Sequence, residues 1–169
     1  MHAAAYSFVA HAVGSAKVDK VVEIGSRHIN GSIRPIFSLA TEYVGVDITP
    51  GAGVDVVMPG QDYVPLFKPD VVVCCEVLEH VDVATGFAIV SNAVKMLKKG
   101  GKFYATIAHI ARAPHSAVDG GPLRPGEYYE NVTIETLKYW DEMIEEPHTL
   151  SIEVSPNSED VYITVEKLK

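Results

Sequence analysis

The sequence predicts an α/β fold whose doubly wound sheet of about seven strands is mostly parallel and ends in an antiparallel hairpin. Short apolar runs alternate with segments of helical periodicity along most of the chain, which is typical of parallel strands joined by crossover helices. The last two alternating segments, 149–154 and 160–167, are joined by too few residues for a crossover. They must therefore pair antiparallel.

Composition predicts one folded domain, 1–169, because 169 residues with 47% hydrophobic content suffice for a sizeable core. The net charge of −8 speaks against broad contact with a nucleic acid backbone. Cys74 and Cys75 are adjacent inside an apolar run, where an ordinary disulfide does not form, so we expect reduced thiols and a cytoplasmic protein. No apolar stretch approaches the roughly 20 residues that span a membrane.

The first part of the chain predicts one amphipathic helix, three strands and a crossover helix. The first helix covers about 3–14 of an N-terminal segment, 1–16. Asn30 and Ser32 are capping candidates for a crossover helix over 31–41. The strands are predicted where apolar, β-branched runs meet turn residues, at 19–24, 43–47 and 54–57.

The second part begins with a continuous apolar run over 69–75, typical of a strand buried on both faces. Apolar residues at helical spacing predict a helix over 83–98, and a further strand follows at 102–107. Residues 109–128, rich in Pro and Gly, are expected to form a loop that acts as a lid. Thr133 then opens a helix over 131–145 before the hairpin.

Acidic residues end the first two predicted strands. Glu23 lies just before the first turn and Asp47 at the tip of the second strand. In nucleotide-binding α/β folds, an acid about 20 positions after a glycine-bearing strand–loop–helix unit binds the ribose hydroxyls. Gly25 is that glycine here. The spacing therefore predicts a nucleoside site.

The turn after Gly25 is a poor match to a pyrophosphate site. A dinucleotide fingerprint needs two further glycines, but Arg27 and Asn30 occupy those positions. Glu23 would also repel a pyrophosphate. These residues disfavour a nicotinamide dinucleotide and favour a cofactor with ribose, adenine and a cationic end, such as S-adenosylmethionine.

Six segments in this order resemble class I S-adenosylmethionine-dependent methyltransferases of the small, single-domain, type 11-like kind. The matching segments are 22–26, 30–32, 43–47, 53–57, 76–81 and 96–103. The resemblance implies a Rossmann-like fold and S-adenosylmethionine as cofactor. It places Asp47 on the ribose hydroxyls and Ile48 on the adenine. The remaining cofactor-binding residues that it implies lie near the methionine portion and the sulfonium: Glu23, Gly25, Ser26, Cys75 and Glu76.

The resemblance implies transfer of a methyl group, by in-line displacement, to a small-molecule acceptor. The sulfonium already activates the methyl, so a base is needed only if the acceptor loses a proton. The catalytic candidates are His109, at the end of a predicted strand, and His80. Glu79 and His115 are further candidates.

Departures from the family pattern motivate the first of two alternatives. Arg27 and His28 replace small residues, and Pro59 stands where an adenine-binding acid is usual, with Asp62 a nearby substitute. These differences favour a catalytically silent cofactor- or nucleoside-binding module, or a partner module, with the same fold.

The second alternative is a metal-assisted RNA 2′-O-methyltransferase. Glu76, Glu79 and His80 resemble the metal-binding spacing of the small-RNA enzymes, in which His109 or His115 would complete the set. The acidic charge and the lack of an RNA-binding extension speak against it. We therefore expect no metal, no nucleic acid and no membrane partner; the sequence does not indicate an oligomeric state.

Overall fold

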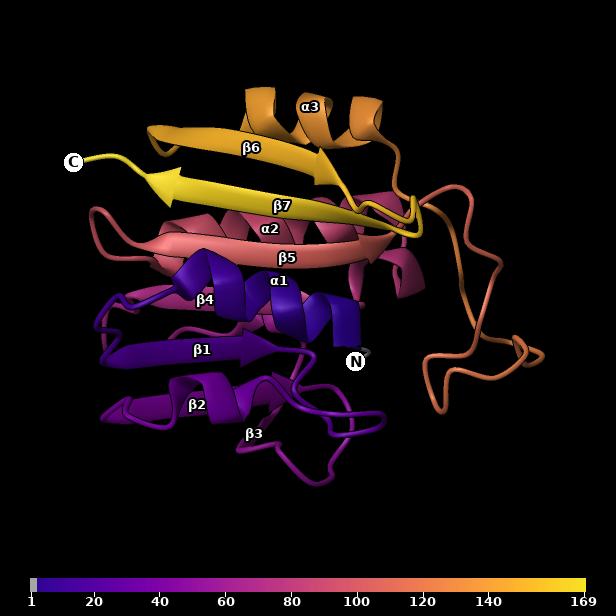
Figure 1. Cartoon of the computed structure of the whole chain (residues 1–169), viewed down its shortest axis with the longest axis horizontal. Helices are drawn as coiled ribbons and strands as arrows, with labels where there is room; N and C mark the ends of the chain where they lie inside the picture. Colours follow the sequence, from indigo (N-terminus) through magenta and orange to yellow (C-terminus); the bar gives the residue numbers. More distant parts are fainter. Residues whose placement is uncertain (1–2) are drawn as a thin grey trace.

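One seven-stranded sheet organises the protein in this computed structural model, which describes residues 3–169 (Figure 1). Its strand order is β3-β2-β1-β4-β5-β7-β6. Neighbours from β3 to β5 pair parallel, and β7 pairs antiparallel with β6, as the sequence predicts. The structure adds that β7 also pairs antiparallel with β5. The strands are β1 (Lys20–Ile24), β2 (Glu42–Asp47), β3 (Val56–Val57), β4 (Val71–Cys75), β5 (Lys102–Ala108), β6 (His148–Val154) and β7 (Asp160–Lys167).

Three α-helices form at predicted positions, and two of them begin at a capping side chain. The Asp82 carboxylate accepts hydrogen bonds from the first turn of α2, and the Thr133 hydroxyl accepts one from the first turn of α3. The helices are α1 (Ala3–Val13), α2 (Val83–Met96) and α3 (Ile134–Met143), with short 3₁₀ turns η1 (Arg34–Phe37), η2 (Gly60–Asp62) and η3 (Leu78–His80). Residues 1 and 2 of the predicted N-terminal segment lie outside the described residues.

Both faces of the sheet are covered, and the alternation of side chains along β1 shows it. Val21 packs in the core on the side of α1 and η1, whereas Val22 packs in the core on the side of α2 and α3. Figure 1 shows α1 lying across one face of the sheet and α2 behind β5 on the other. Strands buried on both faces explain the continuous apolar runs in the sequence.

The helix predicted over 31–41 is wrong. Only one 3₁₀ turn, η1, forms there, and Pro35 lies in its first residues. The Ser32 hydroxyl does accept a hydrogen bond from the Arg34 N–H, but it does not start a longer helix. The segment is bounded on both sides, because Gly31 has a φ of 130°, outside the helical region, and the Thr41 N–H donates to the Asp19 carbonyl just before β1.

One predicted strand is shorter in the structure than in the prediction, and the state of the cysteines agrees with the prediction. The short strand expected over 54–57 is reduced to Val56–Val57. Cys74 and Cys75 are free thiols. Within residues 3–169, no helix combines the length and hydropathy that crossing a membrane requires.

The carboxyl ends of the parallel strands all meet at one edge of the sheet, next to the long segment between β5 and α3 (Figure 1).

Candidate functional site

A cavity of about 470 Å³ opens at the carboxyl ends of β1, β2 and β4. This edge is where open α/β sheets bind ligands. Its walls combine apolar side chains with a few polar groups from five separate segments: Ile24, Gly25, Arg27, Ile29, Val46, Asp47, Ile48, Thr49, Pro59, Gly60, Gln61, Glu76, Val77, His80, Val81, Thr85, Ile89, Ala117 and Val118. We call the part from 24–61 the β1–β2 rim and the part from 76–118 the β4–β5 rim.

Asp47 is the acidic group of the β1–β2 rim. Its Oδ2 atom accepts a hydrogen bond from the Arg27 N–H at 3.1 Å, and its Oδ1 atom accepts one from the Thr49 N–H at 2.9 Å. These bonds fix the carboxylate, and each oxygen keeps a further lone pair for a ligand hydroxyl. Ile48 follows on the rim with 73% of its surface exposed, so it offers an apolar surface to a ring.

Gly25 brings two backbone segments into close contact at the end of β1. Its φ of 77° is in the left-handed region, and a Cβ atom there would lie 2.2 Å from Val77 Cγ2. Its N–H donates to the Val46 carbonyl at 2.8 Å. Only glycine fits this position without strain.

Ser26 is buried beside the cavity and does not line it. Its side chain packs against β2, because a Cβ on Gly45 would lie 2.7 Å from the Ser26 Oγ atom. The same turn approaches Gly53, whose added Cβ would meet the Ser26 carbonyl at 2.6 Å. Ser26 therefore tightens the turn that presents Gly25.

Glu23 and Cys75 belong to the face of the sheet under α1. The Tyr43 hydroxyl donates to the Glu23 carboxyl at 2.5 Å. Burial raises the pKa of Glu23 to about 7, although the bond from Tyr43 opposes this shift. Burial also raises the pKa of the Cys75 thiol to about 12. Neither side chain lines the cavity, and their predicted contacts with a ligand stay predictions.

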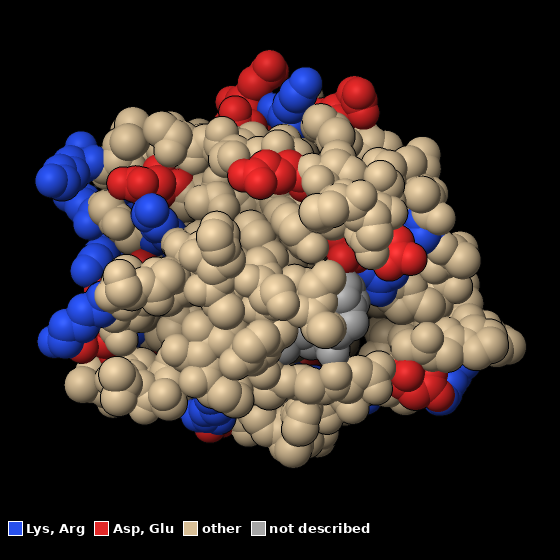
Figure 2. Space-filling view, in the orientation of Figure 1, with Lys and Arg blue, Asp and Glu red and all other residues tan. Residues whose placement is uncertain are grey.

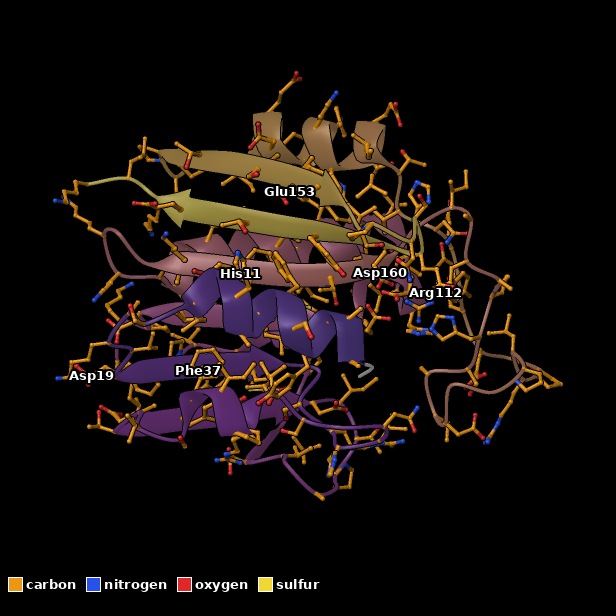
Figure 3. All side chains as sticks on the ribbon, in the orientation of Figure 1. His11, Asp19, Phe37, Arg112, Glu153 and Asp160 are labelled. Carbon is orange, nitrogen blue, oxygen red and sulfur yellow. The ribbon has the colours of Figure 1, made fainter. Side chains whose placement is uncertain are left out.

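Glu76 follows β4 in a strained conformation, with a φ of 58° that non-glycine residues seldom adopt. Its carboxylate accepts hydrogen bonds from the Thr106 hydroxyl at 2.9 Å and from Arg112 Nη1 at 2.6 Å. The same Arg112 nitrogen donates to Asp160 Oδ1 at 2.6 Å. Figure 3 shows Arg112 and Asp160 side by side where β7 meets the long segment. These bonds hold Glu76 at the cavity wall.

The 3₁₀ turn η3 places Glu79 and His80 behind and along the β4–β5 rim. Glu79 is fully buried, and burial together with the charge of Glu76 raises its pKa to about 8. His80 lines the cavity, and burial followed by the charge of His115 lowers its pKa to about 4. The rings of His80, His115 and Tyr129 pack edge to face, with centroids 5.0–5.4 Å apart.

His109, the other catalytic candidate, faces a different part of the protein. Its Nδ1 atom lies 3.0 Å from the carbonyl of Ser158 in the β6–β7 turn. The cavity lining among residues 3–169 does not include it. A catalytic role for His109 therefore stays a prediction without support from this geometry.

Several lining residues were not predicted from the sequence. Gln61 lies in the cavity next to Pro59, whereas the predicted substitute Asp62 does not line it. Ala117 and Val118 reach the cavity from the long segment, which Asn30 Nδ2 anchors through a 3.2 Å bond to the Asp119 carbonyl. The position of Gln61 just after the Pro59–Gly60 turn was the available signal. Ala117 and Val118 were not singled out, although the sequence predicts that the segment holding them, 109–128, acts as a lid.

Charged side chains are unevenly distributed over the molecule. Figure 2 shows Lys and Arg gathered at the edge where the parallel strands begin, which is opposite the cavity. Acidic partners accompany several of these lysines, including Lys20 with Glu42 and Lys98 with Asp70. The opposite side of the molecule shows smaller, scattered groups of Lys and Arg in this view.

Comparison with known proteins gave matches in structure alone, since no known family model and no curated protein matches this sequence. The N-methyltransferase NodS from Bradyrhizobium japonicum WM9, solved with S-adenosyl-L-homocysteine, is 15% identical with a TM-score of 0.66; the match covers 98% of this chain and 86% of NodS.

Two further structures give similar values. A 1,6-didemethyltoxoflavin-N1-methyltransferase from Burkholderia thailandensis, solved with its substrate and S-adenosylhomocysteine, is 13% identical with a TM-score of 0.67; the match covers 99% of this chain and 78% of that one. An S-adenosylmethionine-dependent methyltransferase from Clostridium acetobutylicum ATCC 824 is 12% identical with a TM-score of 0.68, covering 97% and 91%. The protein therefore has the Rossmann-like fold of class I S-adenosylmethionine-dependent methyltransferases.

Proposed function

We propose that this protein is an S-adenosylmethionine-dependent methyltransferase that acts on a small-molecule acceptor. One observation carries the proposal: the cavity places the fixed Asp47 carboxylate beside the glycine turn at the tips of β1 and β2. In this same fold, solved methyltransferases hold S-adenosylhomocysteine.

The β1–β2 rim suits the nucleoside. The free lone pairs of Asp47 accept hydrogen bonds from the two ribose hydroxyls, and Ile48 packs on the adenine. Gln61 is placed to bond the edge of the adenine through its side-chain amide. The methionine portion would then pass the Gly25 turn, which lines the cavity, and the sulfonium would lie near the Glu76 carboxylate.

The β4–β5 rim suits the acceptor. Its lining is mainly apolar, with Val81, Ala117 and Val118, and it adds the polar side chains of His80 and Thr85. An acceptor held there attacks the methyl carbon as the carbon–sulfur bond breaks, and the bonding electrons leave with the sulfur as a neutral thioether. His80 is the base candidate that lines the cavity, for an acceptor that loses a proton.

Calorimetry with S-adenosylmethionine and S-adenosylhomocysteine tests the proposal, followed by transfer of a labelled methyl group to a panel of small acceptors. Asp47→Ala should weaken cofactor binding by about 1–3 kcal/mol, since it removes the acceptor for both hydroxyls. Asp62→Ala is the matched control, because that exposed acid lies outside the cavity lining. An affinity unchanged in Asp47→Ala removes the site assignment, and no binding of either compound ends the proposal.

A catalytically silent binding module is the second candidate, favoured by Arg27 and Pro59. Both residues line the cavity where the family usually has small or acidic residues. The same two measurements separate the candidates. Tight binding of S-adenosylmethionine with no methyl transfer to any acceptor supports the module.

A further inference from the structure

The edge of the sheet where the parallel strands begin carries most of the lysines of the chain. Three segments form this surface: 66–70 before β4, 95–102 around the turn from α2 to β5, and 166–169 at the end of β7. We call them together the lysine edge, which lies at the left of Figure 2. It holds seven of the ten lysines in the sequence: Lys68, Lys95, Lys98, Lys99, Lys102, Lys167 and Lys169.

Backbone hydrogen bonds join the three segments into one continuous surface. The Lys98 N–H donates to the Pro69 carbonyl at 2.9 Å, and the Lys167 N–H donates to the Gly101 carbonyl at 3.0 Å. Burial lowers the pKa of Lys167, and the charge of Lys68 adds to this shift. Lysines from separate segments therefore lie close enough to repel one another.

The charge of the lysine edge is opposite to that of the whole protein. Its only acids are Asp70, paired with Lys98, and Glu166, paired with Lys102. Seven lysines and two acids leave an excess of five positive charges, whereas the whole chain carries −8.

Four lysines of this surface are exposed and form no ion pair with any residue of the described range 3–169: Lys68, Lys95, Lys99 and Lys169. Like charges that gather without partners oppose folding. The fold itself therefore does not explain this cluster, and an anionic partner does.

Apolar side chains project from the same surface. Leu66 is fully exposed, and Leu168, between Lys167 and Lys169, is 42% exposed. Neither leucine belongs to the hydrophobic core. Exposed apolar side chains beside basic ones are typical of surfaces that lie on a membrane, because lipid headgroups attract the charges and the acyl boundary accepts the apolar groups.

We propose that the lysine edge binds the surface of an anionic lipid membrane. The negative potential of such a surface attracts lysines without requiring a fixed geometry. Leu66 and Leu168 enter the boundary between headgroups and acyl chains. The expectation of no membrane partner rested on the lack of a spanning segment, which contact with a membrane surface does not require.

The residue types of this surface favour lipid over nucleic acid. None of the four arginines of the chain lies in the lysine edge. Arginine is the residue that recognises phosphates and guanine with paired hydrogen bonds. A fully exposed Leu66 gains little from a phosphate backbone, whereas it gains from burial in a bilayer.

The position of this surface leaves the cavity accessible. The cavity opens at the carboxyl ends of β1, β2 and β4, whereas the lysine edge lies at their opposite ends (Figure 1). A protein bound through its lysines therefore turns the cavity away from the bilayer, toward acceptors in the aqueous phase.

Sedimentation of the full chain with lipid vesicles tests the proposal. We expect binding to vesicles of phosphatidylcholine with added phosphatidylserine and none to phosphatidylcholine alone, and added salt should weaken the binding. The triple variant Lys68→Gln, Lys95→Gln, Lys99→Gln should bind about 100-fold more weakly, since it removes three unpaired charges. Leu66→Asn should weaken binding about tenfold.

Lys138→Gln and Ile110→Asn are the matched controls, because these exposed side chains lie outside the lysine edge. Both should bind the vesicles like the wild type. All the replaced side chains are exposed, and circular dichroism verifies folding. Cofactor affinity should be the same in every variant, so failure here leaves the proposed function unaffected.

Three results would overturn the proposal: no binding to the anionic vesicles, equal binding to neutral vesicles, or wild-type binding by the triple variant. A fourth concerns soluble partners. If Leu66→Asn binds like the wild type and polyglutamate or RNA releases the protein from the vesicles, the partner is a soluble polyanion and not a membrane.

Discussion

The two rims of the cavity are built by different physical means. The β1–β2 rim is held by backbone groups: Gly25 and the turn after it bond to β2, and Asp47 accepts two backbone N–H groups. The β4–β5 rim is held by buried charged side chains, with Arg112 between Glu76 and Asp160. Short-range backbone geometry is encoded locally, whereas a charge network requires residues brought together by the fold.

Two buried glutamates illustrate the difference. Glu23 has the Tyr43 hydroxyl as partner, at a position where the β1–β2 pairing supplies it. Glu79 keeps one oxygen without a hydrogen-bond partner in the described structure. The Glu23 carboxyl is thus bonded within the sheet, whereas the Glu79 carboxyl keeps one oxygen unsatisfied behind the β4–β5 rim.

The largest expected effect is on the charge network. Arg112→Met should lower the free energy of unfolding by about 3–5 kcal/mol, because two buried carboxylates lose the cation between them. Arg124→Met should cost less than about 1 kcal/mol, since its pair with Asp119 is half exposed on each side. Urea unfolding measures both. Equal effects would show that the β4–β5 rim does not depend on its buried charges.

The next effect concerns the backbone of the other rim. Gly25→Ala should destabilise by about 2–4 kcal/mol, combining left-handed strain with the collision against Val77. Gly100→Ala has nearly the same φ, 75°, and nothing within 4 Å of its new Cβ, so it should cost only about 1 kcal/mol. Adding Val77→Ala to Gly25→Ala should recover part of the loss. No recovery would locate the strain elsewhere.

The pH dependence of stability tests the satisfied glutamate. The folded protein keeps the Glu23 proton up to its pKa of about 7, whereas the unfolded chain releases it near 4.5. The stabilisation from this proton is therefore complete below pH 4.5 and is lost as the pH rises through 7. Glu23→Gln mimics the protonated form. Above pH 7, the free energy of unfolding of this variant should therefore exceed that of the wild type by up to about 3 kcal/mol.

Chemical denaturation at pH 5 and pH 8 measures this difference. Glu42→Gln is the control, since that carboxylate is half exposed in its pair with Lys20. A gain for Glu23→Gln that is equal at the two pH values would contradict the assigned pKa.

The smallest expected effect refines the nucleoside end of the cavity. Gln61→Ala should weaken S-adenosylmethionine binding by about 1 kcal/mol, roughly fivefold, if its amide bonds the adenine. Asp62→Ala should leave the affinity unchanged. The opposite ranking in calorimetry would show that the sequence substitute, Asp62, reaches the ligand after all.

Much of the fold was predictable because its signals are local. Apolar runs of strand length, the caps Asp82 and Thr133, and the short link before β7 depend on neighbouring residues. The helix expected over 31–41 was wrong: Gly31 has a φ of 130° and the Thr41 N–H bonds to the Asp19 carbonyl, and helical periodicity reports neither constraint.

The sequence was sufficient to predict the sheet, its antiparallel C-terminal hairpin, and the positions of Gly25 and Asp47 at the ends of two adjacent strands. Adjacent parallel strands end at one edge, so a residue at each tip is placed by topology alone. Which side chains enter the cavity depends on how distant segments pack together. Glu23 and Cys75 belong to the α1 face, while Gln61, His80 and Val118 line the cavity. Side-chain direction and the path of a long loop arise from packing between distant segments, which no local pattern records.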